Sequence, residues 1–355
     1  MSIHGGDIYR NPGVLDFSAN CNCFGMPASV REAAVQGVQC ANAYPDPECE
    51  ALREAIADYE DVEATQILCG NGASELLLAI TTALQPKRVL LAAPCFLEYE
   101  RVLMAASAKI EWHLLSEKEG YVPRETFLDA LQKTDADMVI LSNPNNPTGA
   151  LLSSEYMEQI VRITKERKIT LILDECFLDF LDEPERYSAK QHLDSDSFLI
   201  VLKAFTKTFA CAGLRIGYLL CMNKEILCNC KSHLPEWNVS LPATYAGIAA
   251  SKERAWLSET SAKIRVEREW LRAQLTKLGF HVYPGAANFL FFTGEAGLYA
   301  HCLSQGILIR DCSNYRGMGS GSYRVCVRRH EENVRFLQVI EGWKENLIGD
   351  CEINS

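Results

Sequence analysis

The sequence of 355 residues has little positive charge and no long apolar segment. Its formal net charge is -11 at pH 7, whereas proteins that bind nucleic acid or anionic membranes present a basic surface. No apolar run approaches the roughly 18 residues that a membrane-spanning helix needs. The first residues, MSIHGGDIYRNPG, lack the basic start and apolar centre of a signal peptide. We therefore expect a cytoplasmic protein that binds neither nucleic acid nor membrane.

Cysteine is abundant, but its spacing does not resemble that of a metal site. Among 15 cysteines the close pairs are Cys21 with Cys23 and Cys228 with Cys230, and no C-x-x-C motif recurs. The 7 histidines form no H-x-x-x-H motif. Most cysteines lie in apolar runs, where a free thiol behaves as a small hydrophobic side chain. We expect reduced, mostly buried thiols and no metal.

The hydrophobic pattern predicts an α/β protein with two domains. From about residue 65, short Val/Ile/Leu-rich runs alternate with amphipathic helical stretches, which is typical of a mostly parallel sheet covered by helices on both faces. Residues 243–279 resemble one long amphipathic helix, and an α+β pattern follows it. We predict a large α/β domain at 41–245. A smaller α+β domain would form from 1–40 and 246–355, with the first 40 residues packing against the C-terminal part.

Distinctive segments follow several of the predicted strands. GNGAS follows the first, PNNPTG follows DMVILS, Asp174 closes TLILD, and KAFTK follows SFLIVL. Because ligands bind beyond the carboxyl ends of the strands in such sheets, we expect these segments to form one site. The GNGAS turn opens a helix whose free N–H groups favour an anion. Asp174 is either a structural cap or ion pair, or a carboxylate that keeps a heteroaromatic nitrogen protonated.

Two lysines four residues apart, Lys203 and Lys207, compete for a catalytic role. A lysine that forms a Schiff base needs a nearby cation to hold the cofactor's phosphate. Lys207 has Gly213 six residues and Arg215 eight residues further on, whereas Lys203 belongs to the end of the strand. This spacing favours Lys207.

The sequence resembles the fold-type-I aminotransferase superfamily, which uses pyridoxal phosphate, over essentially the whole chain. The motifs that carry the resemblance are PNNPTG, the Asp174 strand and K-x-x-x-x-x-G-x-R-x-G-Y. The resemblance implies that Lys207 carries the cofactor as an aldimine and that Asp174 pairs with its pyridine nitrogen. It also implies a homodimer with shared active sites. The other cofactor contacts that it implies are Asn146 at the 3-hydroxyl oxygen, Phe96 stacked on the ring, and Ala73, Ser74, Thr206, Arg215 and the neighbouring subunit's Tyr44 at the phosphate.

Three features resemble the threonine-phosphate decarboxylase family, whose product is the linker of cobalamin. They are HGGD at residues 4–7, LDFSANCNCFGMP, and the ILIR and YRV segments with Arg310 and Arg324. Phe177 replaces the tyrosine of many aminotransferases. Two departures are Ala204, where Ser or Thr is common, and Asp7 in place of Asn. The match implies substrate contacts from His4, Gly5, Asn20, Asn146, Arg310 and Arg324.

The resemblance implies decarboxylation of O-phospho-L-threonine to (R)-1-aminopropan-2-yl phosphate through the Lys207 aldimine and a quinonoid. Two arginines suit a substrate that carries a carboxylate and a phosphate, although both could instead form surface ion pairs. Which arginine binds which anion stays open, as does O-phospho-L-serine as a substrate. The alternatives are a histidinol-phosphate aminotransferase or related transaminase, and a catalytically inactive binding protein that kept the fold.

Overall fold

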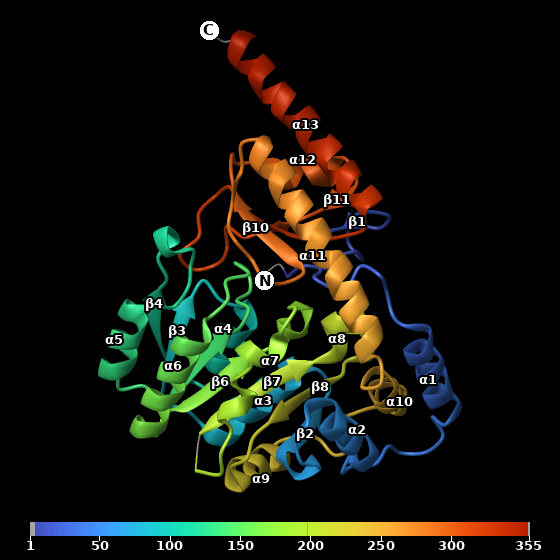
Figure 1. Cartoon of the computed structure of the whole chain (residues 1–355), viewed down its shortest axis with the longest axis vertical. Helices are drawn as coiled ribbons and strands as arrows, with labels where there is room; N and C mark the ends of the chain where they lie inside the picture. Colours follow the sequence, from blue (N-terminus) through green and yellow to red (C-terminus); the bar gives the residue numbers. More distant parts are fainter. Residues whose placement is uncertain (1–3, 197, 354–355) are drawn as a thin grey trace.

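A seven-stranded sheet lies at the centre of the computed structural model, which describes residues 4–196 and 198–353 (Figure 1). Its strand order is β2-β8-β7-β6-β5-β3-β4. Strand β8 runs antiparallel to both of its neighbours, and the other pairs are parallel, which confirms the expected mostly parallel sheet. The strands are β2 (Ile67–Gly70), β3 (Arg88–Ala93), β4 (Lys109–Leu114), β5 (Met138–Ser142), β6 (Thr170–Asp174), β7 (Leu199–Ala204) and β8 (Gly217–Leu220).

Helices cover both faces of this sheet because successive strand residues point to opposite sides. In β6, Leu171 and Leu173 pack with the core of α2, α5 and α6, whereas Ile172 packs with that of α3, α4 and α9. The helices are α2 (Glu50–Glu60), α3 (Ala73–Leu84), α4 (Leu97–Ala105), α5 (Glu125–Lys133), α6 (Ser154–Arg167) and α9 (Lys224–Ser232). Two short helices, α7 (Pro184–Tyr187) and α8 (Phe205–Thr208), flank β7 along the chain.

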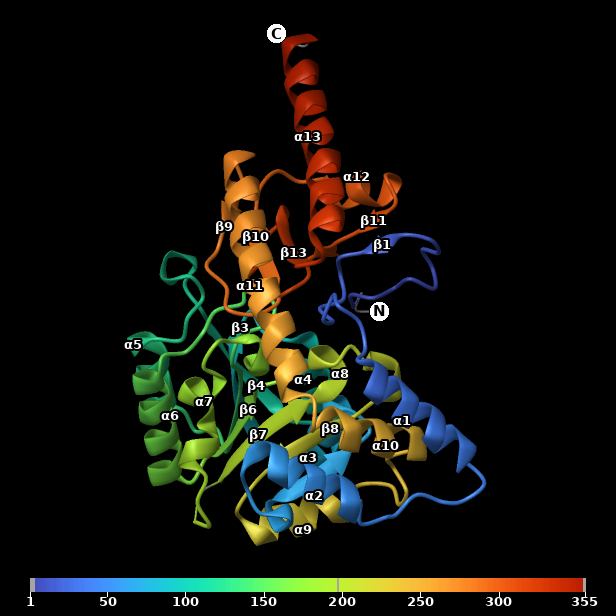
Figure 2. The same ribbon diagram turned by 45° about the vertical axis from the view of Figure 1, so that its right-hand side comes forward.

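The C-terminal third builds a second, antiparallel sheet in the order β12-β13-β10-β9. A separate hydrophobic core forms around it, with Phe289, Phe292 and Val325 buried. Its elements are α11 (Arg254–Lys277), β9 (His281–Val282), β10 (Phe289–Thr293), α12 (Leu298–Ser304), β11 (Ile307–Leu308), β12 (Arg310–Asp311), β13 (Ser322–Cys326) and α13 (His330–Ile353). Figure 2 shows α11 running from the central sheet toward this second sheet.

The N-terminal residues contact both parts of the chain. Strand β1 (Leu15–Asp16) pairs in parallel with β11, and the backbone N–H of Cys326 donates to the carbonyl of Phe17. Helix α1 (Ala28–Gln39) instead packs along α10 (Leu241–Ala250). The division into domains at 41–245, 1–40 and 246–355 stays a prediction.

The single helix expected over residues 243–279 is wrong. The chain forms α10 and α11, separated by residues 251–253. Helix α10 is held between α1 and α2, whereas α11 leaves at a different angle (Figure 1). The break is stabilised by side chains, since the Ser251 hydroxyl donates to the carbonyl of Ile248 at 2.9 Å and Ser29 donates to the Glu253 carboxylate. Within the part of the chain that the structure describes, no helix is both long and apolar enough to cross a membrane.

Candidate active site

A cavity of about 310 Å³ lies at the carboxyl ends of the central strands, where the sequence predicted a site. We call it the Lys207 cavity. It combines segments far apart in the sequence, including the N-terminus, the start of α3, the ends of β5 and β6, and α8. The predicted site residues that line it are His4, Gly5, Asn20, Ala73, Ser74, Phe96, Asn146, Asp174, Thr206, Lys207, Arg215 and Arg324.

The structure separates the two competing lysines. Lys203 belongs to β7 and is buried, with its Nζ 2.7 Å from Glu60 and 3.0 Å from Asp179. Burial acts to lower the pKa of Lys203, but the charges of Asp179 and Glu60 raise it well above its ordinary value. Lys207 follows the strand in α8 and lines the cavity. Lys203 is therefore a structural cation, and Lys207 is the lysine that can meet a ligand.

Asp174 is held at the end of β6 by two hydrogen bonds. It lies two residues after Ile172 and so faces the side of the sheet covered by α4. There the hydroxyl of Tyr99 donates to Asp174 Oδ2 at 2.7 Å, and the N–H of Cys176 donates to Oδ1 at 3.0 Å. Burial and the charge of Asp174 raise the pKa of Tyr99 well above its ordinary value, so the phenol stays a donor. The carboxylate is fixed in place at the cavity wall.

The start of α3 and the β7–β8 connection form a close-packed cradle. Gly72 has a φ of +80°, and a Cβ there would lie 2.4 Å from the guanidinium of Arg215. A Cβ on Gly217 would lie 2.6 Å from the backbone N of Ala73. Gly72 is favoured by its positive φ, and Gly217 by the backbone that lies beside it. The two glycines allow the Arg215 guanidinium to approach the first N–H groups of α3. A cation beside a helix N-terminus is a suitable site for a phosphate.

Arg324 and two asparagines form the polar wall opposite. Arg324 donates to the side-chain oxygen of Asn146 and, at 2.7 Å, to the carbonyl of Ser18. Within the described part of the chain, Arg324 Nε and Asn20 Oδ1 are buried without a hydrogen-bond partner. Because an unpaired buried polar atom costs about 1–3 kcal/mol, this wall is suited to a polar ligand.

The N-terminal segment reaches this wall. The ring of His4 lies edge-on to that of Phe96, with centroids 6.2 Å apart. Gly5 packs so tightly that a Cβ would lie 2.2 Å from the carbonyl oxygen of Ser18. Burial lowers the pKa of His4, the charge of Glu98 opposes this shift, and Arg310 adds to it. His4 and Gly5 therefore line the cavity, and their contact with a substrate stays a prediction.

Arg310 lines an adjoining cavity of about 130 Å³ rather than the Lys207 cavity itself. Both cavities share His4, Gly5 and Ser18. The guanidinium of Arg310 donates to the carbonyl of Asp311 at 2.6 Å and to Asn314 Oδ1 at 2.8 Å. The two arginines thus lie in neighbouring compartments, each held by its own contacts.

Tyr44 is the predicted site residue that lies apart from both cavities. Its side chain is 80% exposed, and its ring packs against that of Trp237 with centroids 4.8 Å apart. A residue in this position can act in a neighbouring subunit but contributes no wall to either cavity of its own chain.

Sequence reasoning missed other residues of the site. Tyr99 has a weak signal, because it follows Phe96 by three residues and one helical turn brings such positions near each other. Tyr99 itself supports Asp174 and is not among the lining residues. The lining residues that sequence reasoning missed are Ser18, Ala19, Glu98, Cys176 and Tyr315.

The residues around the Lys207 cavity fit pyridoxal phosphate. Lys207 supplies an amine, Asp174 a fixed carboxylate, Phe96 an aromatic face, and the Arg215 cradle a place for a phosphate. The orphaned polar atoms of Asn20 and Arg324 leave donors and acceptors for the remainder of a substrate.

Comparison with known proteins also points to an enzyme that uses pyridoxal phosphate. The profile of the family described as aminotransferase class I and II matches residues 12–340. A threonine-phosphate decarboxylase from Salmonella typhimurium is 35% identical over 96% of both chains. The crystal structure of the histidinol-phosphate aminotransferase from Clostridium acetobutylicum has a TM-score of 0.87 at 30% identity and covers 94% of this chain and 100% of its own. That of the Sinorhizobium meliloti enzyme in complex with pyridoxal-5'-phosphate has a TM-score of 0.83 at 21% identity, covering 97% and 96%. The chain therefore belongs to the class I and II aminotransferase family, which confirms the predicted fold-type-I architecture and the prediction that it is an enzyme.

Proposed function

We propose that this enzyme decarboxylates O-phospho-L-threonine to (R)-1-aminopropan-2-yl phosphate, the linker of cobalamin, with pyridoxal phosphate as its cofactor. The observation that carries the proposal is the entry of His4 and Gly5 into the Lys207 cavity, beside Arg324. The sequence of this N-terminal segment resembles that of the threonine-phosphate decarboxylase family. The name of the Salmonella relative supports the same activity.

The residues of the cavity divide the work of holding the cofactor. Lys207 would hold its aldehyde carbon, Asp174 its ring nitrogen, and the Arg215 cradle its phosphate. When bound, the cofactor supplies an electron sink for the pair of electrons that remains after CO2 leaves. The hydrogen bond from Tyr99 keeps Asp174 in position for this task.

The chain's own residues would select the bond that breaks. Arg324 and Asn146 are joined by a hydrogen bond and can orient a substrate carboxylate together, because a guanidinium presents donors in a planar fork. Orientation of the Cα–carboxylate bond decides between loss of CO2 and loss of a proton. Once CO2 has left, Cα takes up one proton, and Lys207 Nζ is the group that can deliver it.

The adjoining compartments suit a substrate with two anions. Phosphothreonine carries about three negative charges near neutral pH. Arg310 and Arg324 line adjoining cavities that share His4, Gly5 and Ser18 as wall residues, an arrangement that suits a substrate with two separate anions. These local cations compensate for the negative net charge of the whole chain.

Phe177 also supports the decarboxylase assignment. It is buried and packs edge-on against Phe289 with centroids 5.1 Å apart. A phenylalanine cannot supply the phenol that many aminotransferases place near the cofactor's 3-hydroxyl oxygen. One hydrogen bond that tunes the cofactor's basicity is then absent.

Transamination of histidinol phosphate is the second candidate. The structural match to the Clostridium histidinol-phosphate aminotransferase favours it. A transaminase needs an amino acceptor such as 2-oxoglutarate, whereas a decarboxylase does not, so the two candidates predict different products.

A product assay on the cofactor-loaded protein separates them. O-phospho-L-threonine, O-phospho-L-serine and histidinol phosphate are each supplied with and without 2-oxoglutarate, and CO2 and glutamate are measured. We expect CO2 from O-phospho-L-threonine without the keto acid. Glutamate formation without CO2 would contradict the proposal. The Lys207→Ala protein serves as the inactive control.

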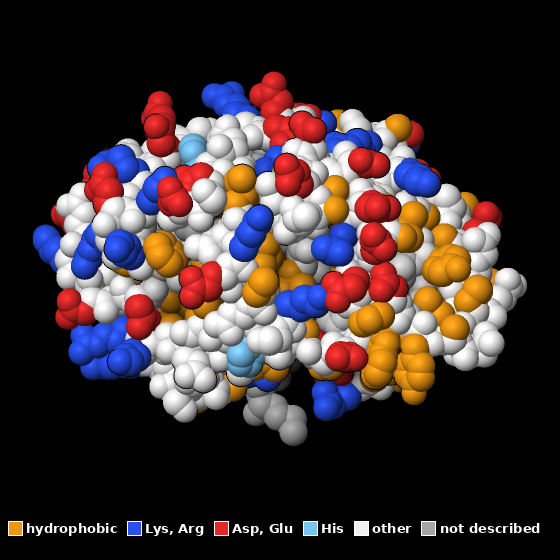
Figure 3. All heavy atoms as spheres, turned by 90° about the horizontal axis from the view of Figure 1, so that it is seen from below, with side chains coloured by type: hydrophobic (Ala, Val, Ile, Leu, Met, Phe, Trp, Pro, Cys, Tyr) orange, Lys and Arg blue, Asp and Glu red, His pale blue; other side chains and the backbone are white. Residues whose placement is uncertain are grey.

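We propose further that the enzyme is a homodimer with shared active sites. Tyr44 and Trp237 are exposed, as are Val35 and Val38 of α1. Figure 3 shows hydrophobic side chains gathered at the right-hand end of the face, the side on which α1 lies in Figure 1. Mixing inactive Tyr44→Ala and Lys207→Ala chains tests this arrangement, because a shared site restores activity in the mixed dimer. No recovery, with mixed dimers formed, would contradict it.

A further inference from the structure

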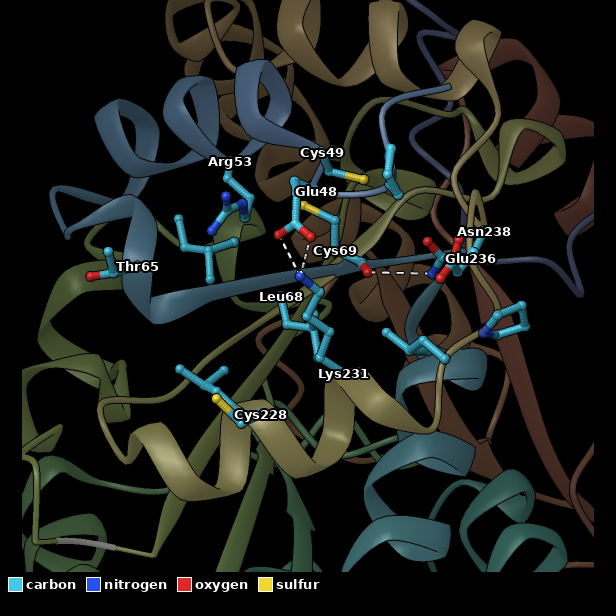
Figure 4. A pocket seen from close by; sticks show the side chains of 15 residues that line it. Glu48, Cys49, Arg53, Thr65, Leu68, Cys69, Cys228, Lys231, Glu236 and Asn238 are labelled. Carbon is cyan, nitrogen blue, oxygen red and sulfur yellow. Dashed lines mark hydrogen bonds and ion pairs between the residues drawn. The ribbon is translucent and has the colours of Figure 1, made fainter. Parts of the chain in front are cut away.

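A second cavity of about 310 Å³ lies between α2, β2 and α9, with residues 234–238 at its edge (Figure 4). We call it the thiol cavity, because Cys49, Cys69 and Cys228 line it. Its lining residues differ entirely from those of the Lys207 cavity. Lys231 pairs with Glu48 beside the thiols, and both of these side chains are exposed. The cavity of the single chain therefore has charged, exposed side chains at its mouth.

Two of the three thiols form a pair. Cys49 immediately precedes α2 with a φ of 50°, and Cys69 lies in β2. Their side chains are close together in Figure 4, and both residues belong to the same buried cluster. Both residues are buried, with exposed fractions of 6% and 3%, and both thiols are free. Twenty residues apart in the sequence, the two thiols are neighbours only because the start of α2 packs on β2.

The pair is electrostatically asymmetric. Interaction with the thiol of Cys69 lowers the pKa of Cys49, whereas burial and the charges of Asp46 and Glu48 oppose the shift. The same interaction, together with burial, raises the pKa of Cys69 well above its ordinary value. The guanidinium of Arg53 lowers the pKa of both thiols. These directions favour Cys49 over Cys69 as the attacking thiol.

We propose that Cys49 and Cys69 are a redox modification site, at which a hydroperoxide converts the two thiols into an intramolecular disulfide. The thiolate of Cys49 attacks the O–O bond, forms a sulfenic acid and releases water or an alcohol. The sulfur of Cys69 then attacks the sulfenic sulfur, loses its proton and displaces a second molecule of water. Two thiols are oxidised and one peroxide is reduced. An external dithiol reverses the reaction by exchange.

Three other buried cysteines differ from this pair in their ionisation. Burial raises the pKa of Cys95, Cys230 and Cys302 to about 12 in each case, so little thiolate is available for attack. Cys228 shares the cavity but is exposed. It is therefore a control for accessibility without the paired geometry.

A disulfide would join the segment that carries Tyr44 to the strand that leads to the Lys207 cavity. Cys49 follows Tyr44 by five residues, and after β2 the chain passes through Gly72 to the start of α3. The bridge would tie the start of α2 to β2 and restrict both segments. The oxidation itself requires no particular reaction at Lys207, so it can be tested independently of the proposed function.

Peptide mapping of the full-length, cofactor-loaded protein tests the pair. The reduced protein is treated with a small excess of hydrogen peroxide, remaining thiols are alkylated under denaturing conditions, and peptides are mapped without reduction. We expect a Cys49–Cys69 bridge that disappears on treatment with dithiothreitol. Cys49→Ala and Cys69→Ala should each abolish it and leave the remaining cysteine of the pair unbridged, and the matched Cys228→Ala variant should keep it.

The order of attack is tested with a sulfenic acid trap such as dimedone. In Cys69→Ala we expect the adduct on Cys49, whereas in Cys49→Ala we expect Cys69 to stay reduced. The wild-type map does not depend on the folding of any variant. Unbridged Cys49 and Cys69 in the wild-type protein, under conditions that oxidise Cys228, would overturn the proposal. So would bridges from either residue to other cysteines.

Discussion

The hydroxyl of Tyr99 donates a hydrogen bond of 2.7 Å to Asp174 Oδ2, and both side chains are buried. Tyr99 comes from α4 and Asp174 from the end of β6, so the bond joins a helix to the strand that it covers. A hydrogen bond to a buried charge contributes about 1.5–3 kcal/mol. Tyr99 is thus a positioning residue for the carboxylate that we assign to the cofactor's ring nitrogen.

Replacing Tyr99 with phenylalanine tests this relationship, because it removes the donor and keeps the ring. We expect the free energy of unfolding to fall by about 1.5–3 kcal/mol and the visible spectrum of the bound cofactor to change. Denaturant titration and absorbance measure the two effects. Tyr156→Phe is the matched control, since Tyr156 donates to Glu125 near the surface, and its loss should change stability less than that of Tyr99. Equal losses in both variants would contradict a special role for Tyr99.

Loss of Lys203 should lower stability, whereas loss of Lys207 should lower activity. Lys203→Met leaves Asp179 buried without its cation and Glu60 with Lys190 alone, which should destabilise the fold by about 3–5 kcal/mol. Lys207→Ala should keep the fold and lower kcat by about a thousandfold or more. Denaturant unfolding and the product assay measure the two losses. A stable, inactive Lys203→Met protein beside an active Lys207→Ala protein would reverse the assignment.

The sequence predicted much of the fold and of the cofactor side of the site, since both depend on local signals. Apolar runs marked all seven strands of the central sheet, and GNGAS, PNNPTG and the Lys207 motif marked their ends. The break between α10 and α11 was missed because their helical patterns join across residues 251–253. The Glu60–Lys203 pair was missed because it joins β7 to a helix early in the chain. The sequence around Glu60 or Lys203 contains no local pattern that predicts this pairing.

Two glycines on either side of Arg215 offer a test of the cradle. Gly217→Ala places a Cβ 2.6 Å from the backbone of both Gly72 and Ala73, whereas a Cβ on Gly213 meets nothing within 4 Å. Overpacking of this kind costs about 1–3 kcal/mol. We expect Gly217→Ala to raise the dissociation constant of pyridoxal phosphate at least about tenfold and Gly213→Ala to leave it nearly unchanged. Absorbance titration of the cofactor-free protein measures both constants. Equal affinities in the two variants would show that the cradle does not hold the phosphate.

Glu175 should make stability depend on pH. Its carboxylate accepts from the Ser188 hydroxyl at 2.7 Å and the Ala189 N–H at 2.6 Å, yet burial raises the pKa of Glu175 to about 7. The protonated form is therefore favoured by folding. The stabilisation of the folded state by protonated Glu175 is complete below the unfolded pKa near 4.5. It is lost as the pH rises through the folded pKa of about 7.

Glu175→Gln isolates this contribution, because glutamine keeps the shape of the protonated acid and does not titrate. Between about pH 5 and pH 8 we expect the wild-type protein to lose about 2 kcal/mol more of its unfolding free energy than the variant. Denaturant melts of both proteins across this range give the difference. Parallel pH profiles would mean that Glu175 titrates outside the range and that its two hydrogen bonds outweigh burial.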